Sequence, residues 1–288
     1  MGKTNLLALP KSKKLMSQFL APKGYKASRF DKNSVEPHCL AQLSKDTNLL
    51  RIYGKEARHQ DVYLFTASHF PNINVPVDDN DDTYKNDFDK VRSLYNLDGF
   101  TSLEEFKRVK TLLDSERTFA KAPFLGWCYG LTDHGLSRDI NIPLYQATQI
   151  MNIIDKTFPG KDRYHKWLLR ERKKSGGWVI NGRGNPICVA NRKRKDIVNS
   201  VIQSTGVQLL NRCVYHISNE IKRIKLDSIW SRPNYHDEAI LFVREDEIER
   251  YNEVIDYGFD RLNDELGWDV IIKHGGVSVD SSWIVRCS

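Results

Sequence analysis

The sequence predicts an α+β protein, in which a few strands combine with many helices. Three features favour this class: a strand-like run at residues 26–31, a long helical pattern at residues 197–224, and an amphipathic pattern at residues 245–266. Hydrophobic residues make up 40% of the 288 residues, which suits a soluble protein with a substantial core. The length fits one large domain or two of ordinary size.

The first half of the chain begins with a predicted strand, residues 26–31, and a helical pattern of leucines follows up to Ile52. Residues 71–87 are rich in Pro, Asn and Asp, which is typical of a loop or an insertion. Ser102 and Glu105 have the spacing of a capping box, so we expect a helix to start there.

The second half is expected to be mostly helical, with helices at residues 142–156, 197–224 and 245–266. Gly267 follows the last of these and should end it, because glycine readily adopts the left-handed conformation of a helix C-terminus. Residues 269–279, "DVIIKHGGVSV", are expected to form a hairpin.

The charge and cysteine patterns exclude some classes of protein. No run of eighteen apolar residues exists, so no membrane partner is expected. The five cysteines are scattered without a CxxC pair, which favours reduced thiols in the cytoplasm over a zinc site. The net charge is +7, and basic runs at residues 170–174 and 191–195 flank a Gly-rich turn with Arg183. This pattern is expected of a surface that follows phosphates.

The stretch "RPNYHDEAILFV" places His236, Asp237 and Glu238 directly before a strand-like apolar run. One interpretation is an ordinary hairpin turn, because Asp tolerates turn geometry. The other is a metal-binding aspartate, which needs a second carboxylate at the end of another strand.

A second motif lies in "RTFAKAPFLGWCYG", where Arg117, Lys121, Leu125 and Tyr129 are each four residues apart. On a helix these positions drift slowly around one face. Two cations one turn apart suit a triphosphate, and the apolar and aromatic side chains beyond them suit a sugar and a base pair. An ordinary amphipathic surface helix would show the same pattern.

Taken together, the motifs resemble the family A DNA polymerases, the DNA polymerase I type. That family has an Arg-x3-Lys-x7-Tyr-Gly signature and a His-Asp-Glu motif, and both occur here in the family's order. The remaining matches are an Asp-x4-Glu motif, an Asn-x3-Gln pair and a basic turn, here Asp31 with Glu36, Asn199 with Gln203, and Gly182 with Arg183.

The resemblance implies a palm in which Asp31, Asp237 and the backbone carbonyl of Lys32 hold two Mg²⁺ ions, with Mn²⁺ as a substitute. Such ions lie about 3.5–4 Å apart. It also implies that Glu238 and His236 lie near the primer terminus. Magnesium prefers oxygen ligands, which the two aspartates supply.

The resemblance further implies a mostly helical fingers subdomain that binds deoxynucleoside triphosphates. Arg117 and Lys121 would neutralise the phosphates, Tyr129 would pack near the nascent pair, and Glu36 would exclude a ribose 2′-hydroxyl. Primer-template DNA would be contacted without sequence reading by Arg183, Asn199, Gln203 and His236.

Two positions in the nucleotide site depart from the family pattern. Leu125 stands where the family usually has an aromatic ring, and Tyr63 stands where many members have a histidine. Pro123 falls inside the fingers helix, so a bend or an irregular start is expected there.

The expected subdomains are a first palm part at residues 1–38, fingers at residues 39–198 with an insertion at about 71–101, and a second palm part at residues 199–288. A thumb and an exonuclease have no counterpart in the chain. We therefore expect a separate thumb or exonuclease polypeptide, as in a split polymerase of a phage that acts in the host cytoplasm.

Other interpretations stay open at this point. The chain could be a non-catalytic DNA-binding accessory subunit that keeps the fold and lacks the chemistry. A single-subunit RNA polymerase or a reverse transcriptase fits less well, because Glu36 and the order His-Asp-Glu are typical of family A DNA synthesis.

Overall fold

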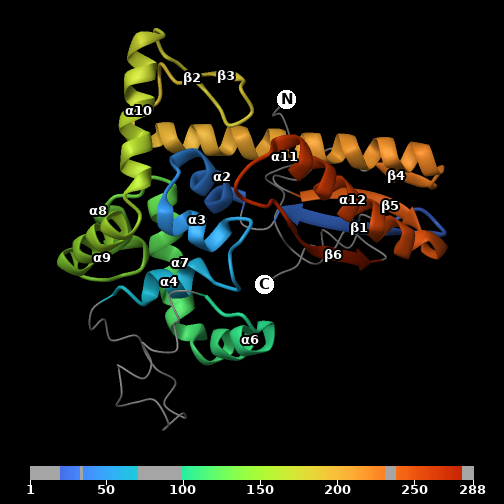
Figure 1. Cartoon of the computed structure of the whole chain (residues 1–288), viewed down its shortest axis with the longest axis horizontal. Coiled ribbons are helices and arrows are strands. Elements are labelled where there is room, and N and C mark those ends of the chain that lie inside the picture. Colours follow the sequence, from blue (N-terminus) through green and yellow to red (C-terminus); the bar gives the residue numbers. More distant parts are fainter. Residues whose placement is uncertain (1–19, 33–34, 71–98, 231–237, 281–288) are drawn as a thin grey trace, which may run out of the picture. The chain divides into compact units, whose positions relative to one another are not determined.

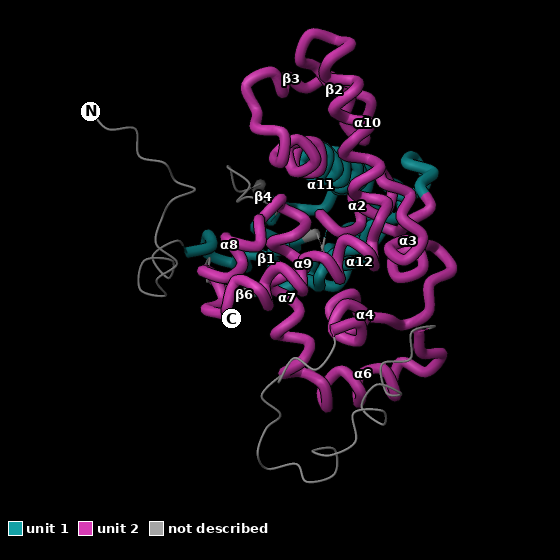
Figure 2. The backbone as a smooth tube through the Cα atoms, turned by 90° about the vertical axis from the view of Figure 1, so that its left-hand side faces the viewer, with its two compact units in different colours: residues 1–35, 205–268, 272–288 teal, residues 36–204, 269–271 magenta. Residues whose placement is uncertain are grey.

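The computed structural model describes residues 20–32, 35–70, 99–230 and 238–280 (Figure 1). The chain divides into two compact units (Figure 2). Unit 1 contains residues 1–35, 205–268 and 272–288, and unit 2 contains residues 36–204 and 269–271. No helix in the described ranges is both long and apolar enough to cross a membrane.

Unit 1 is built on an antiparallel sheet with the strand order β4-β5-β1-β6. Apolar residues, including Ile240, Phe242 and Val243, make up most of β5, and its Ala239, Ile240 and Leu241 are fully buried. Such side chains pack well on a pleated surface. The strands are β1 (Tyr25–Lys32), β4 (Ser228–Trp230), β5 (Glu238–Arg244) and β6 (His274–Asp280).

Two helices complete unit 1: α12 (Ile248–Leu266) and the later turns of α11 (Ile197–Ile224). Phe259 of α12 meets Phe30 of β1 edge to face, with ring centroids 6.1 Å apart. A Cβ on Gly258 would lie 2.3 Å from Cγ1 of Ile217, so glycine lets α12 approach α11 closely. Gly267 ends α12 with φ 57°, which confirms the predicted stop.

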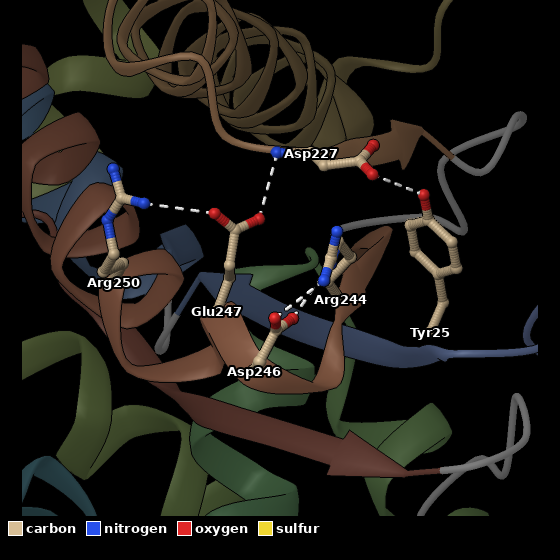
Figure 3. A network of polar contacts seen from close by, with 6 residues as sticks. All are labelled: Tyr25, Asp227, Arg244, Asp246, Glu247 and Arg250. Carbon is tan, nitrogen blue, oxygen red and sulfur yellow. Dashed lines mark hydrogen bonds and ion pairs between the residues drawn. The ribbon is translucent and has the colours of Figure 1, made fainter.

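A polar network joins the strand ends of unit 1 to its helices (Figure 3). The hydroxyl of Tyr25 donates to Asp227 at 2.8 Å, which raises the pKa of Tyr25. The backbone N–H of Asp227 donates to Glu247 at 3.1 Å, and Arg250 pairs with Glu247 at 3.1 Å. The link between α11 and β4 is therefore held to the start of α12.

Unit 2 is mostly helical, with one small antiparallel hairpin of strands β2 and β3. Its core is aromatic: the rings of Phe124, Trp127 and Phe158 have centroids 5.5 to 5.7 Å apart and are fully buried. The elements are α2 (Val35–Ser44), α3 (Thr47–Tyr53), α4 (Val62–Ala67), α6 (Leu103–Leu112), α7 (Asp114–Cys128), α8 (Asp133–Asp139), α9 (Leu144–Thr157), α10 (Gly160–Lys174), β2 (Trp178–Ile180), β3 (Pro186–Cys188) and the 3₁₀ turn η2 (Arg194–Asp196).

Most predicted elements are confirmed, including the α+β class. The predicted start of α6 is confirmed, because Ser102 Oγ accepts the N–H of Glu105 at 3.3 Å, which is one of the two bonds of a capping box. The leucine pattern up to Ile52 is not one helix: Lys45 has φ 48°, and Asp46 starts a second helix by accepting two backbone N–H groups. A left-handed residue interrupts the helical bonding there.

The hairpin predicted for residues 269–279 is wrong. Only β6 forms, and it pairs with β1. The N–H of Ile272 donates to the Asn263 side chain, and its carbonyl accepts from the same amide, both at 2.8 Å. These contacts use the backbone groups that a hairpin would need.

Pro123 does not end α7, which runs as one helix from Asp114 to Cys128. Proline removes only one bond of the ladder, the one to the carbonyl of Phe119. Pro123 and Phe124 are buried, so packing of this face compensates for that loss. The insertion expected around residues 71–101 lies almost entirely outside the described residues.

Candidate active site

The carboxylates predicted to hold metal begin with Asp31 on β1. Asp31 is exposed and lies directly opposite Glu238, the first residue of β5, in the antiparallel register. Opposed residues in such a pair have side chains on the same face of the sheet. Asp237 and His236 lie outside the described residues, and Lys32 is described only as the last residue of β1.

Gly275 of β6 makes space for the Asp31 carboxylate. A Cβ at this position would lie 2.4 Å from Oδ1 of Asp31 and 3.2 Å from its Cγ. Any side chain here would displace the carboxylate or the strand, because real Cβ atoms do not come so close. The two glycines of "HGG" are the sequence signal that could have identified this contact.

A buried arginine lies beneath Glu238. Arg29 is 6% exposed, and its Nε lies 3.6 Å from Oε1 of Glu238. Arg29 and Asp31 share a strand face, because side chains alternate along a strand. The cation of Arg29 partly balances the acidic charge at this end of the central strands.

Helix α7 presents the predicted nucleotide-binding residues one turn apart. Lys121 is exposed and makes no side-chain bond to any other residue of the described ranges. Leu125 is half-buried, and Tyr129 follows the last residue of the helix with 39% of its surface exposed. Lys121 is therefore available to an anionic ligand.

Arg117 is instead bound to Asp61, a residue that the sequence patterns did not single out. Its Nε donates to Oδ2 of Asp61 at 2.8 Å, and its guanidinium lies 5.1 Å from the Tyr63 ring centroid. The other carboxylate oxygen of Asp61 caps α4 by accepting the N–H groups of Tyr63 and Leu64. The signal for Asp61 was its place directly before "VYLFTA", as a helix N-cap.

A second cluster joins three predicted residues that are far apart in the sequence. The Glu36 carboxylate, in the first turn of α2, accepts a hydrogen bond from the Tyr129 hydroxyl. Gln203 of α11 donates to the same carboxylate at 3.4 Å. Their spacing in the sequence does not predict a contact. Only the resemblance to family A polymerases placed all three residues near the substrates.

Burial and the nearby acids keep the tyrosines of this region neutral. Burial, the Glu36 charge and the hydrogen bond to it raise the pKa of Tyr129 well above its ordinary value. Burial, followed by the Asp61 charge, raises the pKa of Tyr63 to about 12. Tyr63 can therefore donate a hydrogen bond at neutral pH, but it cannot supply the positive charge of a protonated histidine.

The predicted DNA-contacting residues of unit 2 lie on two elements. Arg183 is in the β2–β3 turn, where Asn181 Oδ1 accepts its N–H at 2.9 Å. Asn181 also donates to Ser204 of α11 at 2.9 Å, which fixes the turn to the helix. The buried side-chain oxygen of Asn199, one turn before Gln203, has no hydrogen-bond partner among the described residues.

The donor atoms at the end of the β1–β5 strand pair suit a hard divalent cation. Asp31 offers exposed carboxylate oxygens, and Gly275 leaves room beside them. Magnesium binds oxygen ligands and usually needs only one or two carboxylates, with substrate phosphates and water completing its shell. The described residues contain no group of three or more His, Cys, Asp or Glu side chains that could hold a metal.

Comparison with solved structures shows that the fold is shared with a polymerase domain. The chain is similar to the structure described as the POL domain of Pol1 from M. smegmatis in complex with DNA primer-template and dNTP. The TM-score is 0.69 at 19% identity, over 99% of this chain and 45% of that chain.

Comparison of sequences then gives the family. Residues 99–276, more than half of the chain, match DNA polymerase family A, and the chain belongs to this family. It is 24% identical over 254 residues to DNA polymerase I of Pseudomonas aeruginosa, covering 84% of this chain and 23% of that protein. It is 25% identical over 188 residues to the DNA polymerase of Mycobacterium phage D29, covering 65% of this chain and 24% of that protein. The chain thus spans about a quarter of the length of these relatives.

Proposed function

We propose that this chain forms the catalytic part of a DNA-directed DNA polymerase, which adds deoxynucleotides to a primer 3′-hydroxyl. One observation carries the proposal: in a chain of DNA polymerase family A, the strand register pairs Asp31 with Glu238, the residue after Asp237. The proposal assigns metal binding to Asp31 and Asp237 and to the carbonyl of Lys32. Magnesium ions, when bound, lower the pKa of the primer hydroxyl and stabilise the leaving pyrophosphate.

In this proposal, unit 2 binds the incoming nucleotide through α7. Lys121 neutralises the phosphates, because it is exposed and has no carboxylate partner in the described ranges. Arg117 assists with the N–H groups that Asp61 does not occupy, since the ion pair uses its Nε. Fixed cations stabilise the charge that develops during phosphoryl transfer.

Glu36 limits the space for the sugar in the nucleotide site. The proposal assigns to Glu36 the exclusion of a ribose 2′-hydroxyl, and the contacts of its carboxylate with Tyr129 and Gln203 support its position. Leu125, half-buried on α7, gives the sugar an apolar contact. Arg183, Asn199, Gln203 and His236 contact the duplex backbone or minor groove, without reading sequence.

The experiment is template-directed single-nucleotide incorporation with Mg²⁺, on four primer-templates that differ in the templating base. The reaction is run with and without a thumb-bearing fragment of a family A polymerase, because a separate thumb polypeptide is part of the proposal. We expect addition of the complementary deoxynucleotide alone. DNA binding without incorporation under either condition would favour a non-catalytic binding subunit.

A variant pair tests the nucleotide site within the same assay. Lys121→Ala should raise the KM for the deoxynucleotide at least tenfold, because it removes a charge-assisted contact worth about 1.5–3 kcal/mol. Lys107→Ala, which removes an exposed lysine from α6, is the control and should leave the KM unchanged. Equal KM values for the two variants would exclude Lys121 from the site.

A further inference from the structure

The hairpin of unit 2 exposes an apolar face. Trp178 and Ile180 of β2 are 48% and 50% exposed, whereas Val179 between them is buried. In the strand register Trp178 lies opposite Cys188, and Ile180 lies opposite Pro186. Cys188 and Pro186 are also exposed. One side of the hairpin therefore presents four neighbouring side chains to solvent.

A basic hollow lies where α10 turns into this hairpin. Its volume is about 530 Å³, and Arg172 and Lys173 of α10 line it together with Arg194 of η2. In Figures 1 and 2 the hairpin lies alongside the C-terminal end of α10. Gly176 and Gly177, which directly precede Trp178 in the sequence, also line the hollow, so the hollow adjoins Trp178.

The local sequence explains the shape of the hollow. Gly176 and Gly177 have φ values of 69° and 109°, and the N–H of Gly177 donates to the carbonyl of Arg172 at 2.8 Å. This bond is typical of a helix that ends in a left-handed glycine. A Cβ on Gly177 would lie 2.6 Å from Cβ of Ala190, so only glycine lets the two segments meet here.

The three cations of the hollow have no carboxylate partners among the described residues, whereas the neighbouring Lys174 pairs with Glu171 at 3.1 Å. Basic residues in the last turn of a helix often complement the helix dipole, which could explain Arg172 and Lys173. It does not explain Arg194, which comes from another element. Arg172 is also fixed in place, because it donates to the carbonyl of Ala190 at 2.6 Å.

We infer that the hollow and the hairpin face together bind single-stranded DNA. Arg172, Lys173 and Arg194 bind a backbone phosphate, and an unpaired base stacks on Trp178. A cationic hollow beside an exposed aromatic ring is the combination that single-strand binding needs. Three cations around one hollow favour a phosphate-bearing partner, because phosphate contacts dominate the affinity of proteins for nucleic acids. The inference rests on the proposed function for its substrate, the unpaired part of the template.

The first test measures the affinity for a fluorescein-labelled dT12 oligonucleotide by anisotropy, without metal or deoxynucleotide. Trp178→Ala should bind at least about fivefold more weakly, because stacking of one base contributes that factor or more. Trp167→Ala is the matched control, since Trp167 is 41% exposed and stacks on Tyr164. At 100° per residue it lies on the face of α10 away from Leu169 and Arg172, so its variant should bind as the native chain does.

The second test is the salt dependence of the same binding. Lys173→Ala/Arg194→Ala should reduce the slope of log K against log salt by about 1.4, because each phosphate contact to a single strand contributes about 0.7. Lys107→Ala/Arg108→Ala removes two exposed cations from α6 and should leave the slope unchanged.

Three results would overturn the inference. They are dT12 affinity unchanged by Trp178→Ala, an equal loss of affinity for a blunt duplex, and loss of self-association by Trp178→Ala with dT12 binding intact. The last would make the hairpin a protein contact. Failure of the proposed function is distinguishable, because it would abolish nucleotide incorporation while dT12 binding persists.

Discussion

Asp61→Asn should disturb unit 2 strongly, although the substitution hardly changes the shape of the side chain. The Asp61 side chain is 9% exposed and its two oxygens have different tasks: Oδ1 caps α4, and Oδ2 receives Nε of Arg117 at 2.8 Å. Asp61→Asn keeps the shape but has one acceptor oxygen. This single oxygen can either cap α4 or accept from Arg117. In either orientation the amide NH₂ group then faces an N–H donor of the other partner.

The expected loss follows from these contacts. A hydrogen bond to a charged group contributes about 1.5–3 kcal/mol, and its partner Arg117 is only 20% exposed. We therefore expect Asp61→Asn to lower the free energy of unfolding by about 2–3 kcal/mol. Asp61→Ala should cost about 1 kcal/mol more, because it also removes the cap.

The assay is urea denaturation followed by circular dichroism, with Asp162→Asn as the matched control. Asp162 pairs with Lys166 at 2.6 Å, but both side chains are more than half exposed. Such a pair contributes about 0.5 kcal/mol or less. If Asp61→Asn and Asp162→Asn change the free energy of unfolding equally, the buried ion pair does not stabilise the fold as we reason.

Three further predictions concern the site. The pKa of Tyr63 is raised to about 12, so its contribution to the free energy of unfolding is present below pH 10 and is lost as the pH rises from about 10 to 12. Tyr63→Phe should therefore make the free energy of unfolding, measured by urea denaturation, fall less steeply over this pH range. An unchanged slope would contradict this. Gly275→Ala should displace Asp31 and abolish incorporation, yet have little added effect in an Asp31→Ala background; additive losses would show that the glycine acts elsewhere. Glu36→Ala should raise ribonucleotide incorporation relative to deoxynucleotide incorporation, whereas Tyr129→Phe, which keeps the ring, should raise it less; unchanged discrimination in both would remove Glu36 from the site.

Local patterns predicted the elements that local chemistry determines. The strand ending near Asp31 is β1, the capping residue Ser102 begins α6, and Gly267 ends α12 as expected. These features depend on side chains within a few positions of one another, so the sequence displays them directly.

Features that depend on distant partners could not be predicted in this way. The 56-residue separation of Asp61 and Arg117 hid their ion pair. The Asn263 side chain bonds the N–H and the carbonyl of Ile272, and a single strand forms where a hairpin was expected. The first is a long-range contact that no local pattern displays, and in the second a side chain nine residues away overrode the local pattern.

The most direct test of the proposed chemistry is the single-turnover rate of Mg²⁺-dependent nucleotide addition by Asp31→Asn and Asp237→Asn, compared with Asp260→Asn, an exposed aspartate of α12. We predict a loss of at least about 100-fold for each of the first two, because a metal site contributes several kcal/mol to the transition state. Asp260→Asn should retain the native rate. Incorporation that survives either of the first two substitutions at the native rate would contradict the assignment of the metal-binding carboxylates.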